Sequence, residues 1–142
     1  MLLLGTLIFG LFTVLTQTSW AEEKAIKLLN EGNDYSKQGQ FKKAIHAYQK
    51  AIKIDNTLST AHYNLANIFV ATGKTDESIS EYKLAIKLNP LEPDYHRNLG
   101  FAYALQQNGE MAKKKYEDLK VMAPAQAEEL LLWIQQSNQT GK

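Results

Sequence analysis

The sequence repeats itself with a period of 34 residues, and this repeat limits the possible folds more than any other feature. Small, aromatic and turn-forming residues recur in register through three copies. A period of this length with small and aromatic columns indicates a solenoid of helix-turn-helix units. The six columns are Gly32, Ala66 and Gly100; Tyr35, Phe69 and Tyr103; Ala44, Ser78 and Ala112; Tyr48, Tyr82 and Tyr116; Ala51, Ala85 and Leu119; Asn56, Pro90 and Pro124.

The columns have a physical explanation in a pair of packed helices. Small residues let two helix backbones approach closely, and the neighbouring aromatic residues fill the space around the crossing. Gly39 and Gly73 are placed where a short turn between helices needs a positive φ. Pro90 and Pro124 separate one repeat from the next, because proline is excluded from a helix interior but suits its first turn. We therefore expect an all-α fold of seven helices.

This pattern resembles the tetratricopeptide repeat (TPR) family, with repeats at residues 25–58, 59–92 and 93–126. The resemblance implies a right-handed superhelical α-solenoid. A partial fourth copy predicts a C-terminal capping helix over residues 125–137, because terminal repeats need their apolar face covered. Trp133 falls in the column of Leu65 and Leu99, so we expect it to pack against the preceding second helix.

The first 21 residues differ in kind from the repeats. Residues 1–15 are almost wholly apolar, and Ser19 and Ala21 are the small residues that a signal peptidase reads. The apolar run is shorter than the ~20 residues of a membrane-spanning helix. We expect a signal peptide at residues 1–21, cleaved near Ala21, and an exported protein that is periplasmic, lumenal or secreted. The alternative is an uncleaved N-terminal membrane anchor, since no Lys or Arg precedes the apolar run. After cleavage, the mature protein is expected to be one TPR domain, residues 22–137, with a flexible tail at residues 138–142.

Composition argues against several classes of function. There is no cysteine, which excludes disulfides and thiol chemistry, and the net charge is only +1. A nucleic-acid partner is not expected without a continuous basic stripe. Lys113, Lys114 and Lys115 point in different directions on a helix, so we expect a solvated outer face.

No catalytic, metal or cofactor site is expected. His62 and His96 occupy equivalent places in successive repeats, roughly 8–10 Å apart by helix packing. A metal ion needs several ligands at about 2 Å. We expect both histidines to pack at helix interfaces, and the chain not to be an enzyme.

The resemblance also implies a concave groove that is lined by the first helix of each repeat. Aromatic, Arg and amide side chains there suit an extended peptide or a helix, because amides can bond to a peptide backbone. The alternative for the asparagines is that they serve the fold. The candidate partner-binding residues are Asn33, Tyr63, Asn64, Asn67, Arg97 and Phe101.

One ligand class of the family is not expected. Co-chaperones of this family hold a chaperone's C-terminal carboxylate with two Lys, two Asn and one Arg. Asn33 and Asn64 keep the amide places, but Leu29, Asp94 and Asn98 occupy the cationic ones. Charge-assisted hydrogen bonds to a carboxylate are lost without those cations.

Three functions therefore remain open. The first is a non-enzymatic scaffold or adaptor that binds a protein or peptide in the groove, in assembly or trafficking of an envelope or membrane complex. The second is a structural module that forms homo-oligomers through the capping helix, where Leu131 and Leu132 make the surface apolar. The third is an accessory subunit that delivers an enzyme's substrate. A membrane is a partner only through the N-terminal segment, if it stays uncleaved.

Overall fold

Helices account for the whole architecture of the described chain. The computed structural model describes the backbone of residues 2–140 and the side chains of residues 20–137. Within residues 2–140 it contains seven helices and no strand, which confirms the predicted all-α class. The helices are α1 (Leu2–Lys37), α2 (Phe41–Ile54), α3 (Ser59–Ala71), α4 (Thr75–Leu88), α5 (Pro93–Leu105), α6 (Gly109–Met122) and α7 (Pro124–Thr140).

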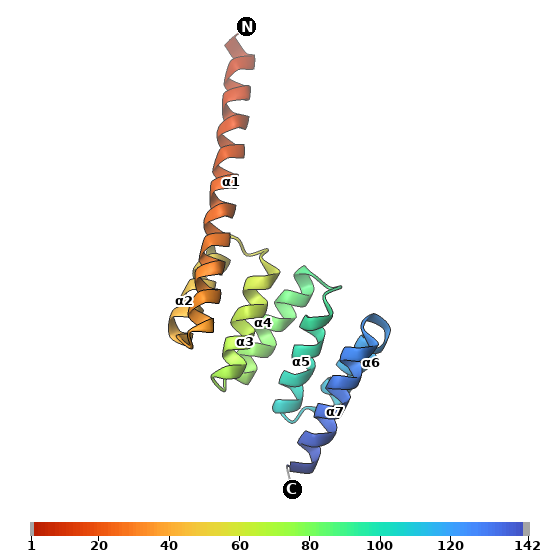
Figure 1. The fold of residues 1–142 in the computed structure, drawn as a ribbon. Helices are drawn as coiled ribbons and strands as arrows, with labels where there is room; N and C mark the ends of the chain where they lie inside the picture. The colour runs from red at the N-terminus through yellow and green to blue at the C-terminus, as the bar shows by residue number, and fades with distance from the viewer. Residues whose placement is uncertain (1, 141–142) are drawn as a thin grey trace.

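The helices form a row of pairs, as expected for an α-solenoid (Figure 1). The pairs are α1 with α2, α3 with α4, and α5 with α6, and α7 packs against both helices of the last pair. The N-terminal part of α1 extends away from the paired helices (Figure 1). The first helices α1, α3 and α5 also contact one another in sequence, so their side chains can build one continuous surface.

The turn inside each pair is the same in all three repeats. The backbone N–H groups of Gln40, Lys74 and Asn108 donate to the carbonyls of Tyr35, Phe69 and Tyr103, at 2.8–2.9 Å. This bond from the second residue after the helix C-cap is the mark of a Schellman motif, which needs one left-handed residue. Gly39 and Gly73 have φ values of 70° and 76°, as predicted. Gln107 takes this place in the third repeat with φ 62°.

The small-residue columns form the helix crossings. Ala44, Ala51, Ala85 and Ala112 are fully buried, and Tyr48 and Tyr82 are 2% exposed. At Gly32 a Cβ atom would lie only 2.5 Å from the Tyr48 ring, so α1 and α2 meet there at glycine distance. Gly100 makes the same kind of approach to Leu130 of α7.

The helix α7 covers the end of the third repeat. Ala127 and Leu130 are fully buried against Leu119 of α6. Trp133 is a packing residue of the cap, as expected, and its ring contact is with the first helix of the preceding pair. It is half-buried, and its ring packs on Phe101 of α5 with centroids 5.5 Å apart. Leu99 is enclosed between α4 and α6, but no further helix among the described residues covers Trp133.

Two other expectations concern charged and titratable side chains. Lys113 and Lys114 are exposed, as expected, but Lys115 is half-buried, and its ammonium donates to Asp118 Oδ2 at 2.6 Å.

His62 and His96 are buried between helices, at 6% and 7% exposure. His62 Nδ1 lies 2.6 Å from Glu81 Oε2, and His96 Nε2 lies 2.8 Å from the carbonyl oxygen of Pro90.

The terminal segments are only partly described. The side chains of the predicted signal peptide up to residue 19, and those of the predicted tail at residues 138–142, lie outside the described residues. Among the residues that were described, no helix is long and apolar enough to cross a membrane.

Candidate functional site

A series of hydrogen bonds joins amide side chains along the first helices. Asn33 Oδ1 accepts from the Tyr48 hydroxyl at 2.9 Å and from Asn64 Nδ2 at 2.8 Å. One repeat later, Asn67 Oδ1 accepts from the Tyr82 hydroxyl at 2.5 Å and from Asn98 Nδ2 at 3.0 Å. Each unit therefore ties a first helix to its own second helix and to the first helix of the next repeat. We call these six side chains the amide series.

The amide series assigns a structural role to the asparagines and also leaves a donor for a ligand. The oxygens of Asn33 and Asn67 are each used twice, which fixes both amide groups in orientation. Within residues 20–137 the Nδ2 group of Asn33 donates to no side chain or backbone, whereas the Asn67 amide also hydrogen-bonds to Tyr63. A preoriented amide donor can bond a peptide carbonyl at small entropic cost.

Two pockets lie along this series. The first groove pocket, of about 250 Å³, is lined by Asn33, Ser36, Lys37, Tyr48, Asn64 and Asn67. The second groove pocket, of about 150 Å³, is lined by Asn67, Val70, Tyr82, Asn98 and Phe101. Asn67 borders both, so the two pockets adjoin across α3. Polar contacts dominate the first pocket, whereas Val70 and Phe101 make the second more apolar.

The three candidate residues other than the asparagines, Phe101, Tyr63 and Arg97, are placed differently from one another. Phe101 lines the second groove pocket and also packs on the Trp133 ring. Tyr63 stacks on Tyr95 with ring centroids 4.7 Å apart and accepts a hydrogen bond from Asn98 Nδ2 at 3.0 Å. Its ring is thus partly used within the fold.

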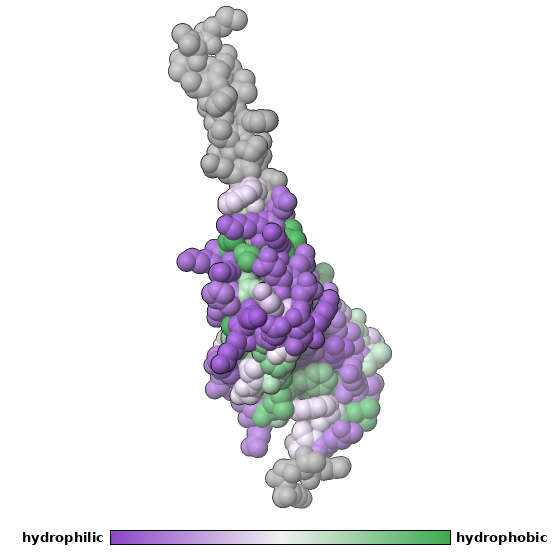
Figure 2. Space-filling model, turned by 60° about the vertical axis from the view of Figure 1, so that its left-hand side comes forward, coloured by the Kyte–Doolittle hydropathy of each residue, from purple (hydrophilic) through white to green (hydrophobic). Residues whose placement is uncertain are grey.

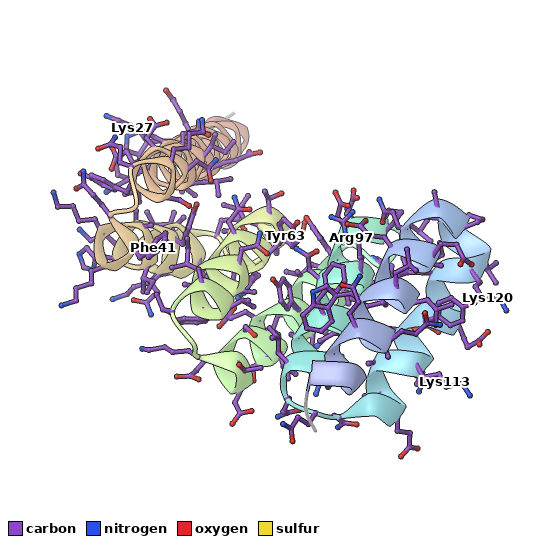
Figure 3. The ribbon with its side chains drawn as sticks, turned by 60° about the horizontal axis from the view of Figure 1, so that its bottom comes forward. Lys27, Phe41, Tyr63, Arg97, Lys113 and Lys120 are labelled. Carbon is purple, nitrogen blue, oxygen red and sulfur yellow. The ribbon has the colours of Figure 1, made fainter. Side chains whose placement is uncertain are left out.

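Arg97 is also engaged within the molecule. Its guanidinium pairs with Asp94 at 3.0 Å and with Glu129 of α7 at 3.4 Å. Figure 3 shows Tyr63 and Arg97 on the neighbouring helices α3 and α5, while Lys113 and Lys120 lie at the far end of the molecule. Arg97 therefore ties the cap to the third repeat at the edge of the groove.

Burial changes the acid–base behaviour of the groove tyrosines. Loss of solvation raises the pKa of Tyr48, Tyr63 and Tyr82 above the ordinary value of 10.0. The effect is largest at Tyr82, where the nearby Tyr63 adds to it. All three hydroxyls therefore keep their protons at neutral pH, and those of Tyr48 and Tyr82 act as donors to the amide series.

Sequence reasoning assigned Tyr48 and Tyr82 only to helix packing and missed their hydroxyl groups in the groove. A signal was available in the spacing. Each tyrosine follows its Asn partner by 15 residues, Asn33 to Tyr48 and Asn67 to Tyr82. In the third repeat Phe101 stands in place of the asparagine before Tyr116.

Metal chemistry finds no support in the described part of the chain. Among these residues there is no group of three or more His, Cys, Asp or Glu side chains that could hold a metal ion.

The comparisons with known proteins agree with this architecture. The profile of a family described as "TPR repeat" matches residues 32–73 and 66–107. In structure, the chain superposes on a domain described as the first TPR of Spaghetti (RPAP3) bound to an HSP90 peptide, SRMEEVD. The TM-score is 0.76 at 30% identity, covering 82% of this chain and 94% of that one. The first TPR domain of human RPAP3 gives a TM-score of 0.76 at 29% identity, covering 84% and 95%.

A sequence relative has an assembly function by name. Over 96 residues the chain is 29% identical to the photosystem I assembly protein Ycf3 of Prochlorococcus marinus strain SARG, covering 62% of this chain. The match spans 56% of that protein, so the chain corresponds to about half of its length.

Proposed function

Because the chain belongs to the tetratricopeptide repeat family, we propose that it is a non-enzymatic scaffold that holds a peptide segment of a partner protein in its first-helix groove. The observation that carries this proposal is the preoriented amide series beside two adjoining pockets. Asn33 offers a donor to a backbone carbonyl of an extended peptide, and Phe101 offers an apolar contact. The solved relative with an HSP90 peptide supports a peptide as ligand class.

We further propose that the partner belongs to an envelope or membrane complex during its assembly or trafficking. The apolar N-terminal segment supports this, since it directs a chain to a membrane either for export or as an anchor. The named relative is an assembly protein of a photosystem, which supports an assembly role. Mass spectrometry of the N-terminal peptide of the protein from its native host tests export. A mature chain that begins after Ala21 supports export, and an intact Met1 favours the anchor.

The groove is tested by comparing partner capture between pocket variants and a matched control. Ser36→Arg fills the first groove pocket, and Phe101→Ala removes the apolar contact of the second. Val121→Arg is the control, because Val121 is 88% exposed on α6 and lines neither groove pocket. Membrane extracts are passed over each full-length variant, and the proteins held by the unmodified chain are quantified by mass spectrometry.

The proposal expects both pocket variants to lose the same proteins by ~10-fold or more, equivalent to at least ~1.4 kcal/mol. Val121→Arg should keep them at an unchanged melting temperature. Phe101→Ala also removes the contact with Trp133, so its capture is measured well below its own melting temperature. Retention of the partners by both pocket variants would contradict the groove assignment.

The alternative of self-association has one specific observation in its favour. Leu132 of α7 is 59% exposed, which is unusual for a residue on a capping helix. If α7 forms a dimer, the mass measured by light scattering rises with protein concentration and falls again in Leu132→Gln. A monomer at all concentrations would exclude this alternative.

A further inference from the structure

A pocket separate from the groove lies at the α1–α2 end of the solenoid. It has a volume of about 290 Å³, and its apolar side is formed by Leu28, Tyr35 and Ala47. The lysines Lys42, Lys43 and Lys50 also line it. We call this the flank pocket. Figure 2 shows the molecule from this side, where hydrophilic side chains cover most of the α1–α2 end and hydrophobic ones lie in patches between them.

The repeat itself indicates what kind of element would cover the flank pocket. Phe69 and Tyr103 share the column of Tyr35, but they are only 8% and 4% exposed, whereas Tyr35 is half-buried. Phe69 clusters with Ala44 and Tyr48 of α2, and Tyr103 clusters with residues of α4. An aromatic residue in this column is thus covered by the second helix of the preceding repeat. At Tyr35 no described element occupies that place.

A second column gives the same result. His62 and His96 are buried at 6% and 7% exposure. Leu28 takes the equivalent place in the first repeat and remains half-buried. Two apolar side chains that the later repeats would bury are therefore accessible together at this end.

The charge around the flank pocket is one-sided. The helix α2 carries four lysines and no acidic residue. None of the lysines of α2 pairs with a carboxylate of the described residues. Lys43 instead lies over the Tyr35 ring, 5.4 Å from its centroid. One carboxylate, Glu31, also borders the pocket.

We propose that the flank pocket docks an amphipathic helix of a partner protein, with an apolar face and acidic residues along both edges. The apolar face would replace the second helix of a preceding repeat over Leu28 and Tyr35. The acidic edges would pair with Lys42, Lys43 and Lys50. This site is distinct from the groove, because no residue lines both the flank pocket and a groove pocket.

The other occupants fit less well. A flat anionic membrane surface satisfies the lysines but does not fill a pocket with an apolar side. A second copy would have to present its own exposed end, where α7 offers Glu128 and Glu129. Glu129 already pairs with Arg97 of the same chain. The acidic helix satisfies both the apolar side and the unpaired lysines.

The test uses the full 142-residue chain in an uncharged detergent. The probe is a fluorescent synthetic helix of about 15 residues, the length at which isolated helices become marginally stable. The probe has Leu and Ala on one face and Glu elsewhere. A control peptide, the lysine helix, has Lys in place of every Glu. Binding is measured by fluorescence anisotropy for the unmodified chain and for the triple variant Lys42→Glu/Lys43→Glu/Lys50→Glu.

A matched triple variant provides the control. Lys113→Glu/Lys114→Glu/Lys120→Glu makes the same change of net charge on α6, away from the flank pocket, and all three of its lysines are exposed. Leu28→Gln tests the apolar side independently. The melting temperature of each variant is measured alongside binding.

The proposal expects the acidic helix to bind the unmodified chain and the α6 control equally. The α2 triple variant should weaken binding by at least ~10-fold and Leu28→Gln by several-fold, and the lysine helix should not bind. The proposal is overturned if the acidic helix does not bind, or if both triple variants weaken it equally. It is also overturned if Phe101→Ala abolishes binding, which would place the helix in the groove.

Two further results identify the rejected occupants. Concentration-dependent dimers that the α2 triple variant abolishes would identify a second copy as the occupant. Binding of anionic phospholipid vesicles but not of the acidic helix, lost in the α2 triple variant, would identify a membrane surface.

Discussion

Gln107 is the one described residue other than glycine with a positive φ, at 62°. It stands where Gly39 and Gly73 make the turns of the first two repeats. A side chain in the left-handed region costs about 1–2 kcal/mol relative to the right-handed one, and glycine avoids this penalty. The third turn is thus the least favourable of the three.

We predict that Gln107→Gly raises the free energy of unfolding by about 1 kcal/mol, because the strain is relieved at the same backbone conformation. Urea unfolding followed by circular dichroism measures this. Gln107→Ala is the control, since it keeps a Cβ atom in the strained conformation and should show no comparable gain. An equal gain in both variants would show that the Gln side chain, and not the φ angle, is responsible.

The helices α1 and α2 approach each other closely at Gly32. An added Cβ would lie 2.5 and 2.6 Å from two atoms of the Tyr48 ring, which is itself 2% exposed. We predict that Gly32→Ala destabilises the protein, because overpacking by about 1–3 kcal/mol exceeds the ~1 kcal/mol gained in helix propensity. The matched control is Gly109→Ala, where nothing lies within 4 Å. The control should be unchanged or slightly more stable, so a Gly32→Ala variant as stable as it would contradict the close approach.

The columns predicted which residues pack at the helix crossings. They did not predict which polar atoms of those residues form hydrogen bonds. Asn33 and Asn67 were identified as groove residues from the resemblance. Their bonds to Tyr48 and Tyr82 depend on where the second helix places a hydroxyl, which the 34-residue period does not encode. The internal partners of Arg97 could not be foreseen either, because Glu129 belongs to a cap whose rotation is set by packing.

At the scale of helices, the cap shows where the periodic pattern stops being a guide. The repeat columns predicted α7 and its buried residues well wherever a neighbouring helix lies on both sides. Trp133 inherits a column that is buried in the full repeats, but α7 lacks a second helix among the described residues, so Trp133 stays half-buried on Phe101. The column therefore predicts burial only where the neighbouring helix exists.

This difference predicts an order of stability within the cap. Leu130→Ala should cost about 3 kcal/mol, because Leu130 is fully buried and its removal leaves a cavity. Trp133→Ala should cost less, about 1–2 kcal/mol, since Trp133 is already partly exposed to solvent. Thermal unfolding of both variants measures the order. A larger loss for Trp133→Ala would mean that this ring, and not Leu130, holds the cap in place.

Over the whole molecule, the buried tyrosines couple stability to alkaline pH. The pKa values of Tyr48, Tyr63 and Tyr82 are raised in the folded chain above 10.0, the value expected when unfolded. Their contribution is therefore fully present below about pH 10 and is lost as the pH rises above it, because the unfolded chain releases those protons first.

We predict a lower urea midpoint at about pH 11 than at about pH 8, with a smaller difference in Tyr82→Phe. Tyr116→Phe is the comparison, as Tyr116 is half-buried and has no role in the amide series. An equal pH difference in the unmodified chain and in Tyr82→Phe would contradict the role of burial at Tyr82.

The chain as a whole should also discriminate between peptide ligands. Its solved relative holds the HSP90 peptide SRMEEVD. Here Leu29 and Asn98 supply no charge at two of the expected cationic places, and Asp94 is paired with Arg97. We predict that SRMEEVD binds more weakly than ~1 mM by titration calorimetry, because charged hydrogen bonds each contribute about 1.5–3 kcal/mol. Binding at micromolar concentrations would contradict this and would assign the groove to acidic C-terminal tails.

The amide series has a direction, and it has an end. In each case the acceptor belongs to the earlier repeat and the donor to the later one. Asn33 accepts from Asn64, and Asn67 accepts from Asn98. In the next unit the acceptor is replaced by Phe101 and the donor by Leu132, so both members of the pair change together. Exchanging both partners for apolar groups leaves no orphaned amide, whereas exchanging one would. A duplicated repeat inserted before the third repeat could consequently continue the series of amide bonds. A repeat added after the third repeat would find no amide at Phe101 to bond with.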